Sequence, residues 1–389
     1  MFIKVNIKLL IINLFYYRIT DKYIKELKMK KDIFTSSIGV IIAGAVIGAI
    51  AAWLSVMGNP ANMGICIACF TRDLAGGLGL HRAAAVQYIR PELIGLVIGA
   101  TASAMLSKEF VPKGGSSPII RFCLGFFAMI GALVFLGCPW RTLLRVAGGD
   151  INGIFGLIGI IIGGGIGVFF WKKNFSLGQP KAYKNKLVGF LPLAISIILL
   201  ILLLQQTKFS EGGPIFFSES GPGSMRAPIA IALIASIVIG FIAQKSRFCT
   251  VGGLRDGIFM KDFHMTKGVI AFIVAAFIVN IATSRFNLSM ENQPIAHTNI
   301  LWNTVSMILT GLAFTLGAGC PGRQVIQSSE GNMDSFIFVI GMLVGAGFAH
   351  NFNLASSTAG PTVYGMGAVI LGLVFCIIIG FTMKENTAN

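Results

Sequence analysis

The sequence predicts an all-α protein that crosses a membrane many times, and its composition and apolar runs carry this prediction. Of its 389 residues, 55% are hydrophobic and only 12% are charged, whereas soluble domains carry about 25% charged residues. The mean hydropathy is +0.80, and several apolar runs approach the roughly 20 residues that a membrane-spanning helix needs. This composition excludes a soluble globular enzyme, and it excludes a disordered chain because disorder requires low hydrophobicity.

Ten apolar segments are expected to span the membrane as helices. They are residues 36–57, 90–107, 120–137, 151–171, 186–204, 227–245, 267–284, 301–319, 335–350 and 362–382. The ninth is short for a span. The third and the eighth end abruptly at Gly-Cys-Pro sequences, Gly137-Cys138-Pro139 and Gly319-Cys320-Pro321.

The distribution of charge predicts how the chain is oriented. The net charge is +16, from 31 Lys and Arg against 15 Asp and Glu. Most basic residues fall on the side of the membrane that carries the N-terminus, notably in the 172–186 and 245–267 loops, and basic loops favour the cytoplasmic side. Both termini are therefore expected to be cytoplasmic, in the inner (plasma) membrane of the cell. Membrane topology explains the positive charge, so no nucleic-acid partner is expected.

The chain contains an internal repeat. Cys66 and Arg72-Asp73 recur at an offset of 183 residues as Cys249 and Arg255-Asp256, and the Gly-Cys-Pro-x-Arg sequences at 137–141 and 319–323 recur at an offset of 182. Five spans separate equivalent points, and an odd number turns the second copy over. The sequence thus predicts two inverted-topology repeats, an architecture in which a transport path lies at the repeat interface.

The predicted organisation follows from this repeat. Residues 1–35 form an N-terminal cytoplasmic leader, and we hypothesise that residues 1–28 precede the true start at Met29, because they are almost free of glycine and differ in composition from the rest. The remaining divisions are 36–171 (repeat 1), 172–226 (a linker with one extra span), 227–350 (repeat 2) and 351–389 (an extra C-terminal helix and tail).

Each Gly-Cys-Pro sequence is expected to break a helix inside the membrane. Gly137 is suited to the left-handed conformation that ends a helix, and Pro139 to the first turn of the next one. Cys138 would then cap the second helix beside its free N–H groups, where a thiolate or another anion is favoured. Arg141 and Arg145 would share a helix face with Cys138. Residues Cys320, Arg323 and Gln327 would form the same face in the second copy.

Cys66 and Cys249 are expected on two further re-entrant half-helices, because broken backbone within a membrane occurs only where protein or a water-filled cavity surrounds it. The four Cys-bearing loops would then meet at the waist of an hourglass. Arg72-Asp73 and Arg255-Asp256 are interpreted as structural ion pairs. Cys123 and Cys376 are interpreted as small apolar residues. A redox role for Cys66-Ile-Ala-Cys69 remains an alternative, whereas no metal site and no cofactor are expected, since no His cluster or second CxxC accompanies the pair.

At these loops the sequence resembles the YeeE/YedE family of inner-membrane sulfur transporters. The resemblance rests on Ser-Arg-Phe-Cys249, Gly-Gly-Leu-Arg255-Asp256 and the two Gly-Cys-Pro-x-Arg elements, and it covers roughly residues 36–382. It implies an hourglass fold and uptake of thiosulfate, which passes between cysteines by S–H···S hydrogen bonds. Cys66, Cys138 and Cys320 would form this relay, with Cys249 as the fourth loop thiol. The chain is closest to the YedE branch associated with selenium metabolism, which leaves thiosulfate and a selenium species as alternative substrates.

The sequence thus predicts a transporter of a small sulfur or selenium anion rather than an enzyme. Its predicted path contains Cys66, Cys138, Cys249, Cys320, Arg141 and Arg323. A small cytoplasmic sulfur-carrier protein is a further expected partner, besides the lipid bilayer. Two other functions stay open: a membrane thiol–disulfide redox enzyme that uses Cys66 and Cys69, and a passive channel for a hard anion.

Overall fold

A computed structural model describes residues 33–205 and 215–384, and the hypothesis about residues 1–28 lies outside them. Ten segments of the described chain are helical, long and apolar enough to cross a membrane, and each overlaps one of the ten predicted spans. The prediction of an all-α, multi-pass membrane protein is confirmed. The long helices are α2 (Ser37–Val56), α4 (Pro91–Leu106), α5 (Pro118–Phe135), α7 (Ile151–Lys172), α8 (Leu191–Leu204), α9 (Ile229–Ser246), α11 (His264–Ala282), α12 (Ile300–Leu316), α14 (Met333–Asn351) and α15 (Val363–Thr382).

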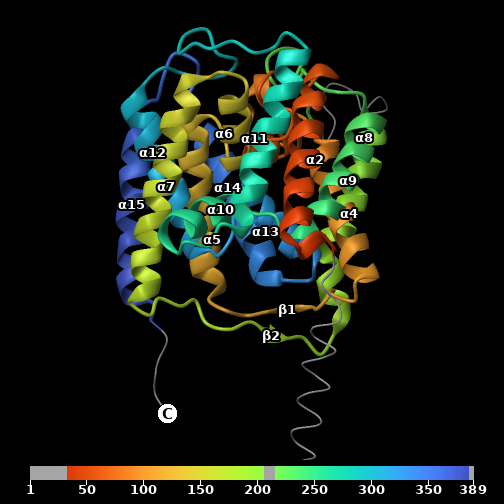
Figure 1. The fold of residues 1–389 in the computed structure, drawn as a ribbon, viewed down its shortest axis with the longest axis vertical. Coiled ribbons are helices and arrows are strands. Elements are labelled where there is room, and N and C mark those ends of the chain that lie inside the picture. Colours follow the sequence, from red (N-terminus) through yellow and green to blue (C-terminus); the bar gives the residue numbers. More distant parts are fainter. Residues whose placement is uncertain (1–32, 206–214, 385–389) are drawn as a thin grey trace, which may run out of the picture.

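Four shorter helices do not cross the molecule. They are α3 (Ile67–Gly77), α6 (Pro139–Ala147), α10 (Thr250–Phe259) and α13 (Pro321–Ser329). Three of them follow a long helix after a loop of three or four residues, and α3 follows α2 after ten residues. The minor elements are the 3-10 turns η1 (Ile33–Thr35), η2 (Ala84–Val86) and η3 (Lys186–Phe190) and the antiparallel strands β1 (Lys113–Gly114) and β2 (Lys181–Ala182). Figure 1 shows the long helices roughly parallel, with β1 and β2 at the bottom.

The long helices pack across the two halves of the chain in an exchanged pattern. Helix α2 packs on α11, and the equivalent helix α9 packs on α4; likewise α7 packs on α12, and α14 packs on α5. In each contact, a helix of one half packs on a helix of the other half, and the two equivalent helices make the reciprocal contact. This is the pattern expected of two structurally equivalent repeats. The short helices follow it too, since α6 contacts α11 and α13 contacts α4.

Glycines allow these helices to approach closely. A Cβ atom on Gly44 of α2 would lie 1.9 Å from the carbonyl oxygen of Gly268 in α11. The other three contacts contain similar glycines, namely Gly99 against Ile237, Gly125 against Phe338 and Gly163 against Ile308. Small residues at such contacts are typical of helix packing in membranes. The glycine excess in the sequence therefore serves mainly helix packing, in addition to the helix breaks.

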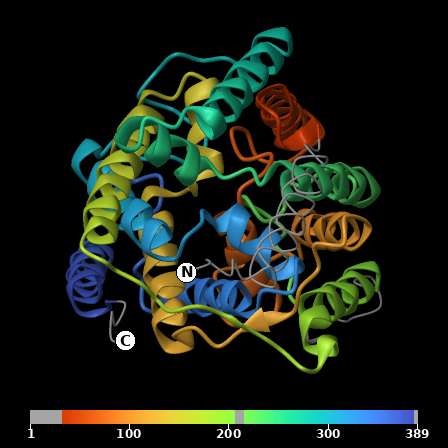
Figure 2. The same cartoon turned by 60° about the horizontal axis from the view of Figure 1, so that its bottom comes forward.

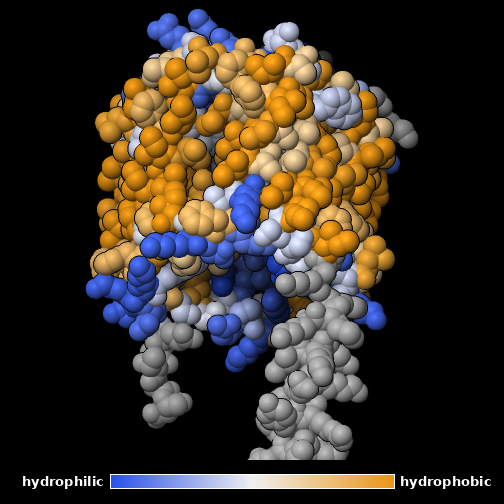
Figure 3. Space-filling view, in the orientation of Figure 1, coloured by the Kyte–Doolittle hydropathy of each residue, from blue (hydrophilic) through white to orange (hydrophobic). Residues whose placement is uncertain are grey.

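The outer surface is apolar along the sides and polar at the ends. Figure 3 shows an orange hydrophobic band over the long helices and blue residues around a hollow at the lower end. Apolar side chains such as Ile198 in α8, Ile278 in α11 and Leu371 in α15 are more than half exposed, which is the expected arrangement for a lipid-facing surface. Figure 2, with the bottom forward, shows the long helices around a central region that the short helices occupy.

Candidate functional site

A cysteine caps the N-terminus of each of the four short helices. Cys66, Cys138, Cys249 and Cys320 directly precede α3, α6, α10 and α13. The Sγ atom accepts a hydrogen bond from a backbone N–H of the first turn in three cases: Cys66 from Cys69, Cys249 from Gly252 and Cys320 from Arg323, at 3.3 to 3.5 Å. Because the first N–H groups of a helix lack partners within the helix, these thiols lie where an anion is stabilised.

The four cysteines form two pairs, one in each half of the chain. The Sγ atoms of Cys66 and Cys138 lie 3.7 Å apart, within the range of a hydrogen bond between thiols. In the second half, the backbone N–H of Cys320 donates to the Sγ of Cys249 at 3.4 Å. All four are free thiols, and their side chains are buried except for Cys249, which is partly exposed. Sequence spacing alone would not show that the loops of one half meet each other.

The helix breaks differ in one detail from the prediction. The left-handed residue that ends α5 is Leu136, with φ of 65°, rather than Gly137, and its counterpart after α12 is Ala318, with φ of 62°. Gly137 instead leaves room for an arginine, because a Cβ atom there would lie 3.1 Å from Cδ of Arg141. Gly319 has the same relationship to Arg323. The glycine of each Gly-Cys-Pro-x-Arg motif thus makes room for its own arginine side chain.

Arg141 is fully buried and holds the loops of the first half together. Its guanidinium donates to backbone carbonyl oxygens of Asn62, Leu136, Pro294 and Ile295, and to the Sγ of Cys69 at 3.6 Å. Within the described residues, no carboxylate forms an ion pair with it. Its positive charge is therefore buried beside the thiols without a counter-ion, and burying an uncompensated charge is unfavourable.

The other two arginines of this pattern are already neutralised. Arg145 pairs with Asp150 at 2.6 Å, and Arg323 pairs with Glu330 at 2.9 Å. In the second half it is Gln324 that binds loop carbonyls, donating to Gly317 at 2.7 Å. A neutral amide can thus brace such a loop, so loop geometry alone does not require the charge on Arg141.

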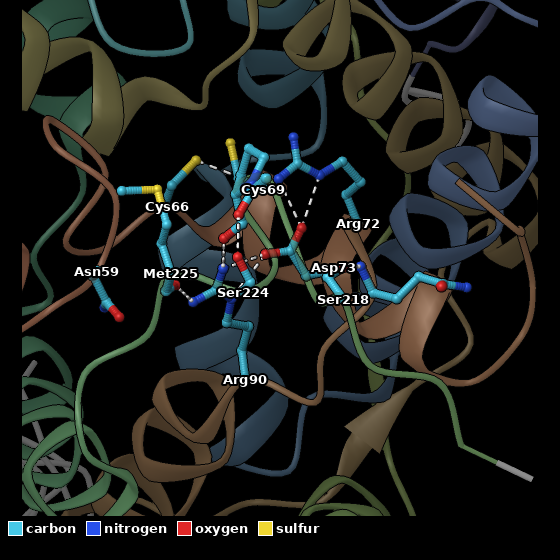
Figure 4. Close-up of polar contacts among 12 residues, drawn as sticks. Asn59, Cys66, Cys69, Arg72, Asp73, Arg90, Ser218, Ser224 and Met225 are labelled. Atoms are coloured by element: carbon cyan, nitrogen blue, oxygen red, sulfur yellow. Dashed lines mark hydrogen bonds and ion pairs between the residues drawn. The ribbon is translucent and has the colours of Figure 1, made fainter. Parts of the chain in front are cut away.

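Arg72 and Asp73 form a buried ion pair at 2.7 Å, as expected for loop-stitching residues. A second cation, Arg90, also pairs with Asp73 at 2.7 Å and donates to the carbonyl oxygens of Met225 and Pro222. Figure 4 shows Arg72 and Arg90 converging on Asp73 beside Cys66 and Cys69. Arg90 was missed by the sequence analysis, although an arginine directly before the Pro91 that opens an apolar span is a usable signal.

The equivalent pair in the second half is more exposed. Arg255 contacts Asp256 at 2.5 Å, with 12% and 27% of their side chains exposed. The guanidinium of Arg255 also lies over the Trp171 ring, 4.2 Å from its centroid. The remaining cysteines lie away from the two pairs along the chain, Cys123 within α5 and Cys376 within α15.

Residues 245–383 match a family model described as sulphur transport. This segment is therefore similar to the sulphur transport family. The match confirms the family suggested by the YeeE/YedE resemblance, and it contains the second thiol pair, Cys249 and Cys320. No curated protein matches the chain significantly. The match to the sulphur transport family and the ten apolar helices together support a membrane protein that transports sulfur.

Proposed function

We propose that this protein takes up a small sulfur or selenium anion, of the thiosulfate class, through a path between the two thiol pairs. The observation that carries the proposal is the buried, uncompensated charge of Arg141 beside the thiols that cap two helix N-termini. A small anion would supply the missing counter-charge there, and the N–H groups of the helices would stabilise it. Arg323 is left outside the site because Glu330 already neutralises it.

The anion would pass from Cys66 and Cys138 to Cys249 and Cys320. Each thiol donates an S–H hydrogen bond to the anion and releases it to the next pair, so no covalent bond forms or breaks. A thiol is polarisable and a weak donor, which suits a soft sulfur or selenium atom better than a hard oxyanion. The two thiol pairs would act as successive sites of weak binding, because transport requires a site that also releases its ligand.

The chain would lie in the inner membrane with both termini in the cytoplasm. The basic loops at that end favour this orientation. They would also favour docking of a small, acidic sulfur-carrier protein that receives the anion. Thiosulfate and selenite remain the two substrates to compare.

Uptake into proteoliposomes tests the proposal. Labelled thiosulfate and labelled selenite are supplied to the wild type and to the Cys138→Ser and Cys320→Ser variants, with Cys123→Ser and Cys376→Ser as controls outside the loops. We expect both loop variants to lose uptake and both controls to retain it. Unchanged uptake in the two loop variants would overturn the relay, and retained flux with Ala at all four loop cysteines would favour a hard-anion channel.

The thiol–disulfide alternative makes a different prediction. A redox enzyme using Cys66 and Cys69 would form a disulfide between them that titrates with a redox buffer and disappears in Cys69→Ser. In the structure, Cys66 and Cys69 are both free thiols, and Cys66 contacts the side chain of Cys138 as well as that of Cys69. We therefore expect free thiols at both positions across redox conditions, as measured by mass spectrometry after alkylation.

A further inference from the structure

Trp140 connects the two Gly-Cys-Pro loops. It is the second residue of α6, two positions after Cys138, and its side chain is fully buried. A Cβ atom built on Gly322 would lie 2.7 Å from Cε2 and 3.0 Å from Nε1 of the indole. Gly322 occupies the same motif position in the second half that Trp140 occupies in the first. The large indole of Trp140 therefore packs against Gly322, which has no side chain, where the two halves are in contact.

The same indole also contacts the third loop. Its ring packs edge-on against Phe248, with centroids 5.9 Å apart, and lies 6.4 Å from the ring of Phe272 in α11. Phe248 directly precedes Cys249, and Gly322 follows Cys320 by two residues. Trp140 thus contacts a residue within two positions of each thiol in the second pair, while its own helix begins directly after a thiol of the first pair.

The indole N–H of Trp140 has no acceptor in the part of the chain that the structure describes, although the nitrogen is buried. An indole nitrogen is only a donor, and a buried donor without an acceptor is unfavourable and rare in native proteins. The packing of the ring alone would be satisfied by phenylalanine. A binding role for the N–H explains why an indole stands at this position.

We propose that the Trp140 N–H donates a hydrogen bond to the transported anion as it crosses from the first thiol pair to the second. This inference rests on the proposed function. A sulfur or selenium oxyanion is an acceptor that lacks donors, so it complements an unpaired N–H. The absence of a side chain at Gly322 leaves the space that the indole uses. Trp140 would accordingly determine the affinity for the anion at the point where it passes from the first thiol pair to the second.

Tryptophan fluorescence tests the inference directly. The chain has four tryptophans, at positions 53, 140, 171 and 302, so the Trp53→Phe, Trp171→Phe, Trp302→Phe triple variant reports on Trp140 alone. We expect its emission to change saturably with thiosulfate or selenite, and to stay constant with chloride at the same ionic strength. Constant emission at concentrations that saturate uptake would overturn the inference.

A second measurement uses the wild-type background. Trp140→Phe keeps an aromatic ring and removes the N–H, and Trp302→Phe is the matched control in α12. We expect Trp140→Phe to raise the KM for uptake about tenfold, as for loss of one hydrogen bond to a charged group, whereas Trp302→Phe leaves it unchanged. Equal KM values in the two variants would overturn the role of Trp140. If the wild type itself transports neither anion, the proposed function fails instead, so the two failures are distinguishable.

Discussion

Asp73 accepts hydrogen bonds from two buried arginines, Arg72 at 2.9 Å and Arg90 at 2.7 Å, measured to their Nε atoms. Arg72 lies on the short helix α3, and Arg90 directly precedes the spanning helix α4. One carboxylate therefore fixes the first re-entrant helix to the next span. The position of Cys66, at the start of α3, depends on this attachment.

We expect Asp73→Asn to destabilise the protein strongly. The change leaves two buried guanidinium groups without a counter-charge, which costs about 3–5 kcal/mol when one partner of a buried pair is removed. Asp256→Asn is the matched control in the second half, where the pair is partly exposed and worth at most about 1 kcal/mol. Thermal unfolding in detergent measures both. Equal losses would show that the first pair is no more important than the second.

Arg141→Gln separates charge from loop bracing. A glutamine amide can still donate to the loop carbonyls, as Gln324 does in the second half, but it carries no charge. We expect thiosulfate binding to weaken by about 10- to 100-fold, the effect of losing a charged hydrogen-bond partner, while the thermal stability changes little. Binding measured by isothermal titration would remain at the wild-type level if the charge of Arg141 only held the loops.

Gly44→Ala should separate two long helices. The added Cβ would meet the backbone of Gly268 at 1.9 Å, so α2 and α11 must move apart and unfolding should occur at a lower temperature. Gly367→Ala in α15 is the control, because a Cβ there meets nothing within 4 Å, and alanine favours a helix by up to about 1 kcal/mol over glycine. The thermal unfolding temperatures of the two variants should shift in opposite directions. A normal temperature for Gly44→Ala would contradict the close packing.

Stability should fall as the pH drops below about 6.5, through two histidines outside the spanning helices. Burial lowers the pKa of His81 and of His297 from the ordinary value of 6.5. In each, Nε2 donates to a backbone carbonyl, of Arg72 and of Val134 respectively. The unfolded chain therefore binds more protons below pH 6.5, and stability rises with pH through that window.

The measurement is the unfolding temperature from pH 5 to 8 for the wild type and for the His81→Gln, His297→Gln double variant. Carboxylates contribute to both proteins alike, so the difference between the two curves isolates the histidines. The charge of Arg72 opposes protonation of His81, whereas the charge of Asp73 favours it. The ring of His350 packs against His81, with the two ring centroids 4.5 Å apart. Parallel curves would show that these histidines contribute no pH dependence.

The spans and the capping cysteines were predictable because both follow from local sequence. Apolar length gives the spans, and Gly-Cys-Pro places Cys138 and Cys320 at helix starts. Partners distant in sequence were not predictable. Arg145 forms an ion pair with the nearby Asp150. Arg141, in contrast, donates hydrogen bonds to the carbonyl oxygens of Pro294 and Ile295, more than 150 residues away. Spacing on one helix face could not distinguish the neutralised arginine from the uncompensated one.

Trp140 illustrates the same limit. Its place in the motif was evident, but its contacts with Gly322 and Phe248 depend on how the two halves meet. The left-handed residue was misplaced by one position because glycine is the usual choice there. Gly137 does not end the helix. Instead, it leaves space for the bulky side chain of Arg141.

The exchanged pairing of long helices also constrains how the chain is assembled during synthesis. Helix α2 finds its partner only when α11 has been made, and α4 must wait for α9. After translation of the first half, the glycine-lined faces of α2 and α4 still lack these partners. Neither half is then an independent folding unit, and the thiol pairs take their final positions only when nearly the whole polypeptide has entered the bilayer.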